Sequence, residues 1–237
     1  METSPLTVRP ATVYEQRVTE FTACADFERF ESGNLTTDDY DRFILNVVRT
    51  HVQSPQLLAF LFALAPPAAA ANICGNMLEE LGVANADGDA HPALLEQLLR
   101  ESGLAHRLGG CKELAELDMR RLVTQPLLYA SLREVGLSAL AEVTAFEYML
   151  SRVADRIAIA LETHRGLSAT AVEWFTHHGR VDIGHAELGL RNLDEYIAYY
   201  AIDEGDASTI IEIAMRENVF IKRYFAEFAL GREVEQS

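Results

Sequence analysis

Two long segments of helical periodicity, 134–165 and 168–200, are separated only by a turn at Gly166. Apolar residues recur in both at the three- and four-residue spacing of a helix, and no convincing alternation of apolar and polar residues indicates a strand. Long helices that follow each other through a short connection pack antiparallel. The pair therefore predicts an all-α bundle.

The remaining chain continues the helical pattern. Further helices are predicted at about 12–31, 37–52, 55–64, 67–82, 90–102 and 206–230. Residues 1–10 are expected to form a flexible tail, 85–89 a loop, and 103–125 a mixed segment broken near Gly109-Gly110. The sequence thus predicts one helical domain over 11–237, a bundle of about seven to eight helices.

The charge balance limits the partners that this chain can bind. It carries 36 acidic and 20 basic residues, a formal net charge of −16. Such a surface repels phosphate backbones and anionic lipids, so we expect neither a nucleic acid nor a membrane as partner. Three cysteines without a CxxC spacing and the lack of a signal-peptide pattern predict a reducing, cytoplasmic location.

The strongest local motif is formed by His178, Asp182 and His185. At about 100° per residue, these side chains fall within about 60° of one another on a helix. Two imidazoles and a carboxylate on one inward face suit iron, zinc or manganese. The alternative is a polar helix face with ordinary histidines. His177 lies on a different face, whose neighbours predict a surface or structural role.

A second signal is Glu147, whose helical neighbours are apolar. A buried carboxylate needs a partner, which is either a metal ion or an arginine. Glu142 lies about 140° around the same helix, on a face with Arg152 and Arg156, and is expected to be exposed or ion-paired rather than to share a site with Glu147.

A third signal joins Glu80 to His91. Glu80 follows Ile73, Asn76 and Met77 on its helix face, so it is predicted to be more buried than Glu79, although Glu79 stays possible as a ligand. His91 begins a helix whose next positions on the same face are leucines, which predicts that its imidazole faces inward. Helix capping is the alternative role for His91.

In these residues the sequence resembles the haem-oxygenase-like diiron oxidases, which are related in fold to thiaminase II and pyrroloquinoline quinone synthase. The resemblance covers about residues 70–190. It implies a helical bundle without haem that binds two iron ions and activates O2, with Glu80 and Glu147 closest to the chemistry. The implied metal ligands are Glu80, His91, Glu147, His178, Asp182 and His185.

The same resemblance implies N-oxygenation, desaturation or oxidative C–C cleavage of a free amino acid, a molecule derived from one, or a fatty acid, in secondary metabolism. A homodimer and an external electron donor are possible partners. Residues considered as substrate contacts are Tyr148, Arg152, Tyr40 and His51.

Two other classes remain open. A metal-independent, thiaminase-II-like hydrolase would need a nucleophilic thiol from Cys24, Cys74 or Cys111, none of which has a context that indicates activation. A non-catalytic interaction module would use the same His and Glu residues structurally. Haem oxygenase itself is disfavoured, because no histidine occurs early in the first predicted helix.

Overall fold

The computed structural model describes residues 5–83, 88–124, 131–216 and 223–225, and every structural statement below refers to these ranges. They contain ten α-helices, one 3-10 turn, one π-helical turn and no strand. In chain order these are α1 (Pro5–Thr22), α2 (Ala25–Glu31), α3 (Thr37–His51), α4 (Ser54–Leu64), α5 (Pro67–Glu80), α6 (His91–Glu101), η1 (Ala105–Arg107), α7 (Leu108–Thr124), α8 (Leu132–Ala160), η2 (Leu161–Arg165), α9 (Glu173–Tyr199) and α10 (Glu204–Arg216).

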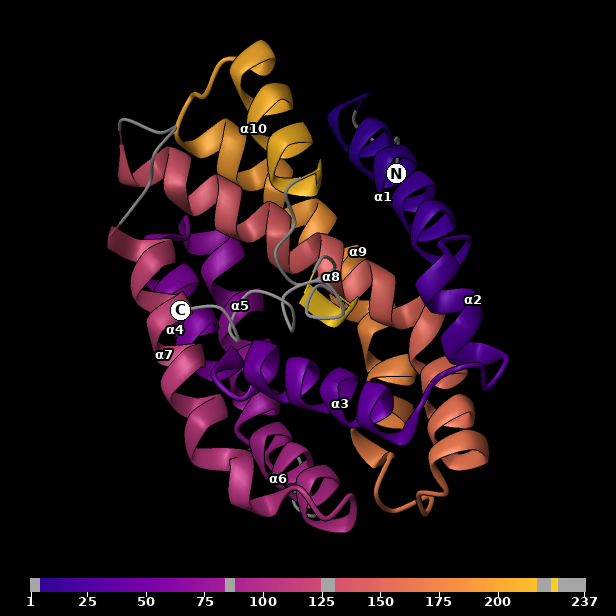
Figure 1. The fold of residues 1–237 in the computed structure, drawn as a ribbon. Coiled ribbons are helices and arrows are strands. Elements are labelled where there is room, and N and C mark those ends of the chain that lie inside the picture. The colour runs from indigo at the N-terminus through magenta and orange to yellow at the C-terminus, as the bar shows by residue number, and fades with distance from the viewer. Residues whose placement is uncertain (1–4, 84–87, 125–130, 217–222, 226–237) are drawn as a thin grey trace, which may run out of the picture.

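The centre of the fold is the pair α8 and α9, which pack antiparallel as the sequence predicts (Figure 1). Gly189 in the second half of α9 faces Thr144 in the first half of α8, whereas Gly179 in the first half of α9 faces Asp155 in the second half of α8. A Cβ atom at Gly189 would lie 2.6 Å from Thr144 Oγ1, so the two backbones come this close only with glycine at that position. The long interface places the inward faces of both helices opposite each other.

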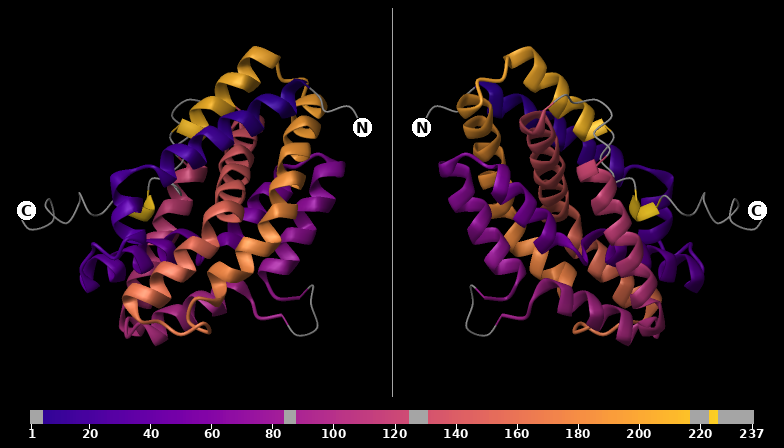
Figure 2. Two further views of the ribbon diagram at one scale, coloured as in Figure 1. Left: turned by 90° about the vertical axis from the view of Figure 1, so that its right-hand side faces the viewer. Right: turned by 90° about the vertical axis from the view of Figure 1, so that its left-hand side faces the viewer.

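The other helices pack beside this pair. In the two side views, α8 and α9 run through the molecule and other helices lie to either side of them (Figure 2). Helices α4 and α10 contact α8, helices α1, α5 and α6 contact α9, and α3 packs against α6 and α7. Consequently α3, α5, α6, α8 and α9 can all bring side chains to the same interior.

The first predicted helix is divided in two. Cys24 adopts an extended conformation (φ −74°, ψ 147°), and its Sγ accepts a hydrogen bond from the backbone N–H of Phe27 at 3.4 Å. It therefore caps α2 and separates it from α1. Helix α1 begins at Pro5, within the segment expected to be a tail.

The predicted mixed segment also needs correction, because 108–124 is one helix, α7. Gly109 and Gly110 lie in its first turn, where backbone N–H groups lack helical partners and glycine costs less. These two differences raise the number of α-helices above the seven or eight predicted. Residues 85–87 of the predicted loop and 217–222 and 226–230 of the last predicted helix lie outside the described residues.

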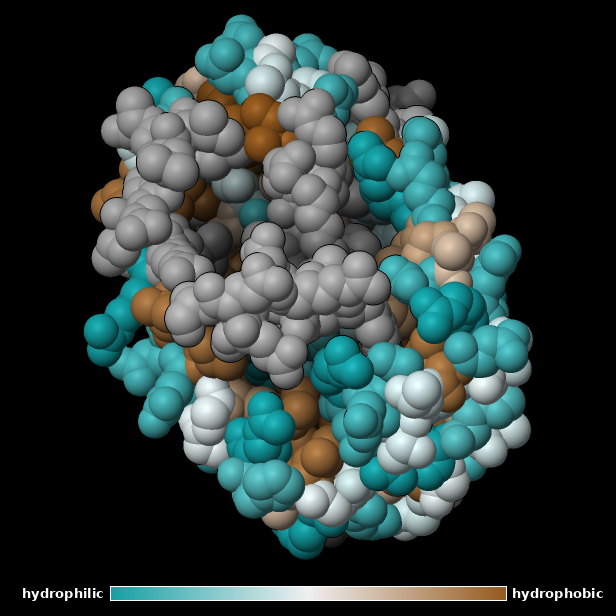
Figure 3. Space-filling model, in the orientation of Figure 1, coloured by the Kyte–Doolittle hydropathy of each residue, from teal (hydrophilic) through white to brown (hydrophobic). Residues whose placement is uncertain are grey.

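Hydrophilic side chains dominate much of the coloured surface in Figure 3, and apolar ones show mainly between them. None of the helices in the described ranges combines the length and the hydrophobicity that crossing a bilayer requires. Residues 223–225 return to the interior, where Tyr224 is fully buried and Phe225 packs among the aromatic rings of α2 and α3.

Candidate metal centre

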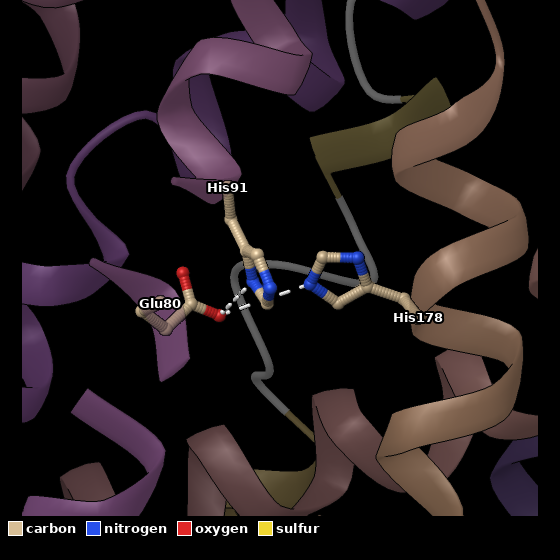
Figure 4. A group of neighbouring side chains, drawn as sticks. All are labelled: Glu80, His91 and His178. Atoms are coloured by element: carbon tan, nitrogen blue, oxygen red, sulfur yellow. Dashed lines mark hydrogen bonds and ion pairs between the residues drawn. The ribbon is translucent and has the colours of Figure 1, made fainter. Parts of the chain in front are cut away.

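Three buried side chains from three helices converge on one point. Glu80 is the last residue of α5, His91 the first of α6, and His178 lies in the first half of α9 (Figure 4). Glu80 Oε1 is 2.8 Å from His91 Nδ1 and 3.7 Å from His178 Nε2. One potential ligand atom from each residue lies within 4.8 Å of the others. This group has the composition and spacing of a metal site.

The imidazole of His178 is held in a defined orientation. Its Nδ1 donates a hydrogen bond to the backbone carbonyl of Trp174 at 2.7 Å, one helical turn earlier, and the Trp174 ring packs against it. Because a carbonyl can only accept, Nδ1 carries a proton and Nε2 is the atom that faces Glu80. Histidine ligands in metalloproteins are commonly fixed in this way.

Neighbouring polar groups orient Glu80 and His91. The Ser54 hydroxyl, at the start of α4, donates a short hydrogen bond to Glu80 Oε2. His91 Nε2 is hydrogen-bonded to His177 Nε2 at 3.0 Å. His177 is thus half-buried against the cluster, not on a solvated face. Burial opposes ionisation of Glu80, but hydrogen bonds from His178 and His91 outweigh it and hold the pKa of Glu80 well below its ordinary value.

A second group lies further along α9. His185 Nδ1 is 3.2 Å from Asp182 Oδ1, and His185 Nε2 is 3.1 Å from Glu79 Oε2. Carboxylates therefore face both ring nitrogens. Burial opposes a charge on His185, but the hydrogen bond to Asp182 and the charge of Glu147 outweigh it and raise the pKa of His185 to about 10. The surrounding carboxylates thus favour a positive charge at this position.

Glu147 belongs to the same interior. It is buried in α8, and its Oε1 accepts a hydrogen bond from the Asn76 side chain of α5 at 2.7 Å. Burial raises the pKa of Glu147 to about 7; the charge of His185 acts against this rise and that of Asp182 adds to it. A carboxylate held among other carboxylates in this way is stabilised by a cation.

The sequence left open whether Glu79 or Glu80 is the metal ligand, and both side chains reach the interior. Glu80 is buried and contacts His91, while Glu79 is partly exposed and contacts His185. The structure therefore places one next to each histidine group. The greater burial of Glu80, predicted from its helix face, is confirmed.

The donor set consists of imidazoles and carboxylates, which bind iron among other metals. Asp182 is almost completely buried, and in the described part of the chain its Oδ2 has no hydrogen-bond partner. Such an atom is costly unless a cation or another partner satisfies it. Within the described residues, Glu80, His91 and His178 have ligand atoms close enough together to hold a metal ion, and Asp182, His185 and Glu79 lie further along α9 and α5 beside them.

Two cavities adjoin these residues. The first, of about 260 Å³, is lined by Glu80, Glu147, His178 and Asp182, and also by residues of α3, α4, α7 and the segment 223–225. The second, of about 550 Å³, lies between α5, α8 and α9 and is lined by Glu79, Glu147 and His185. Glu147 lines both, so small molecules could approach the centre from two directions.

The side chains considered as substrate contacts are mostly elsewhere. Tyr148 donates to Glu15 at 2.7 Å, and Arg152 packs over the Tyr148 ring on the surface. Tyr40 donates to the Phe30 carbonyl in the core. None of these three lines either cavity, whereas His51 lines the first and is hydrogen-bonded to Tyr224.

The sequence reasoning did not identify Arg49, Asp118 and Arg223, which line the first cavity together with Glu142. Glu142, expected to be exposed or ion-paired, is partly buried and lines the same cavity as Glu147, although the helix geometry seemed to exclude a shared site. Five residues of α8 separate the two by about 7.5 Å along the helix axis, and a cavity of this size accommodates both.

The cysteines required by a thiol-dependent hydrolase do not line either cavity. Cys24 caps α2, and the Cys111 thiol is buried and donates to the Leu45 carbonyl at 3.8 Å. Within the described residues the geometry thus gives no support to a thiol nucleophile at this site.

Comparison with known proteins agrees with the donor set. The profile of a family described as iron-containing redox enzymes matches residues 41–216, which include all six predicted ligands. No curated protein matches the sequence. The matched range covers most of the chain and nearly all of the helices that build the centre, and the fold is the all-helical one that the resemblance implied. The chain therefore belongs to this family of iron-containing redox enzymes, which are haem-oxygenase-like in fold.

Proposed function

We propose that this protein is a non-haem diiron oxidase that uses O2 to oxidise a small molecule, by desaturation, N-oxygenation or oxidative C–C cleavage. The observation that carries the proposal is the convergence of three imidazoles and at least three carboxylates in one interior, with the buried Glu147 next to both histidine groups. Two ferrous ions held there would supply open coordination positions and electrons for O2 activation.

The protein's own residues have distinct roles in this proposal. Trp174, Ser54 and His177 hold His178, Glu80 and His91 in position through the hydrogen bonds described above. Asn76 holds Glu147. Because most of the proposed ligands are buried, bulk water is kept away from the centre and electrostatic interactions there are strengthened.

Electron balance implies a further requirement. Full reduction of both oxygen atoms of O2 takes four electrons, and a desaturation or an N-hydroxylation supplies two of them from the substrate. A desaturation releases both oxygen atoms as water, whereas an N-hydroxylation leaves one in the product and releases the other as water. In either case an external donor must supply the remaining two electrons.

The test is anaerobic reconstitution with Fe(II), followed by iron analysis and rapid mixing with O2 in the presence of amino acids or fatty acids. We expect about two equivalents of iron, and a visible absorption band and O2 uptake that depend on one class of substrate. His178→Ala should lose iron, whereas His106→Gln, at an exposed position in η1, should retain it. Less than about a tenth of an equivalent of iron in the wild type would overturn the proposal.

A further inference from the structure

The imidazole of His91 is hydrogen-bonded through both of its ring nitrogens. Nδ1 lies 2.8 Å from Glu80 Oε1, and Nε2 lies 3.0 Å from His177 Nε2. The His91 ring also contacts the rings of His177 and His178, with 4.6 Å between the centroids in each case. His177 and His178 are consecutive residues of α9, so that helix presents two imidazoles to the first residue of α6.

The distances indicate which nitrogen of His91 would face a metal ion. Nitrogen and oxygen ligands about 2.1 Å from one ion lie about 3–3.5 Å apart when they are neighbours around it. From Glu80 Oε1, His91 Nδ1 is 2.8 Å away and His178 Nε2 is 3.7 Å away, which is close to this spacing. His91 Nε2 is instead bonded to His177. An ion between Glu80 and the two histidines would therefore bind His91 through Nδ1.

Binding through Nδ1 determines what His91 Nε2 must do. A neutral imidazole carries one hydrogen, so a ring that gives Nδ1 to a metal ion has its hydrogen on Nε2 and needs an acceptor there. In the described ranges, the hydrogen-bond partner of His91 Nε2 is His177 Nε2. A neutral His177 can accept through this nitrogen if its own hydrogen is on Nδ1, and its half-buried ring leaves part of its surface to solvent.

The place of His91 in the fold explains why a side chain has this role. His178 is fixed by the backbone carbonyl of Trp174, one turn earlier in the same helix. His91 is the first residue of α6, so no turn of that helix precedes it and no helical carbonyl is available. The acceptor for His91 must come from another element, and His177 of α9 lies in the required position.

We propose that His177 is a positioning residue of the metal centre, which accepts a hydrogen bond from Nε2 of His91 and holds that imidazole for binding through Nδ1. His177 lies outside the ligand pattern on which the family resemblance is based. The inference rests on the metal centre of the proposed function but not on the reaction with O2. Removing a partner that orients a ligating imidazole lowers metal affinity by about 10- to 100-fold.

The first test is competition between the protein and a chelator for Co(II) under argon. His177→Leu removes the acceptor but keeps an apolar side chain, whereas His177→Gln restores an acceptor through its amide oxygen. We expect His177→Leu to bind one equivalent of Co(II) about 10- to 100-fold more weakly, and His177→Gln to stay within about threefold of the wild type. His106→Leu, at an exposed position of η1, is the matched control. Thermal melting of the metal-free forms checks that each variant is folded.

The second test needs no variant of His177. In the zinc-loaded wild type with 15N-labelled histidine, N–H couplings should show the hydrogen of His91 on Nε2 and that of His178 on Nδ1. The signals lost in His91→Gln identify the His91 ring. A hydrogen on Nδ1 of His91 would overturn the inference, whatever the effect of the substitutions on folding.

The binding results can also overturn the inference. Wild-type affinity in His177→Leu would show that the hydrogen bond does not matter, and equal losses in His177→Leu and His177→Gln would indicate that His177 is itself a ligand. A wild type that binds neither Co(II) nor Zn(II) would refute the metal centre together with this role of His177. The expected results in a protein that consumes no O2 would support the role of His177 and refute only the oxidase.

Discussion

Glu79 and Glu80 are adjacent in α5, yet Glu80 hydrogen-bonds to His91 at 2.8 Å and Glu79 to His185 at 3.1 Å. Consecutive residues on a helix point about 100° apart, so a single helix end serves both histidine groups. The proposed centre therefore has two halves, one around His91 and His178 and one around His185, and both contact the end of α5. A substitution can disturb one half without the other.

Substitutions at these two positions should have different effects. Glu80→Gln removes a buried carboxylate from the His91–His178 group and should reduce bound iron from about two equivalents to one or fewer. Glu79→Gln should leave one iron tightly bound and weaken the other by about 10- to 100-fold, which iron analysis at graded chelator concentrations would reveal. Glu187→Gln, at an exposed position of α9, is the control. Equal losses of bound iron from Glu80→Gln and Glu79→Gln would contradict the division into two halves.

Loading the centre with metal should stabilise the fold. A ligand that binds only the native state at about one hundred times its Kd adds about 2.7 kcal/mol, which corresponds to a rise in Tm of about 5–10 °C for a chain of this size. Differential scanning calorimetry with Fe(II) under argon measures this rise, and chelation should reverse it. Glu147→Gln should lose most of the rise while melting normally without metal. A rise that survives this substitution would show that the ions bind elsewhere.

Local spacing explains what could be predicted from the sequence. His178, Asp182 and His185 share a face because their separations of four and three residues match the helical repeat, and apolar neighbours indicated that Glu147 is buried. The same reasoning correctly ranked Glu80 as more buried than Glu79. Each of these inferences needs only the spacing of residues within a single helix.

The rest depends on contacts between distant segments. Arg223 meets Asp118 only because residues 223–225 return to the interior, and Asp118 lies in a helix that Gly109-Gly110 seemed to interrupt. Tyr148, considered as a substrate contact, follows Glu147 in the sequence, but one residue along a helix turns the side chain by about 100°, here towards α1. Periodicity gives no information about such long-range pairings.

The hydrogen bond between His51 and Tyr224 should contribute measurably to stability. Both side chains are buried, and the hydroxyl lies 2.8 Å from His51 Nε2. Burial, followed by the charge on His178, lowers the pKa of His51 well below its ordinary value, so the ring is neutral and accepts the hydrogen bond. Tyr224→Phe should cost about 1–3 kcal/mol in urea denaturation. Tyr199→Phe, at a mostly exposed ring, should cost less than about 0.5 kcal/mol. Similar losses of unfolding free energy in the two variants would contradict a buried hydrogen bond between His51 and Tyr224.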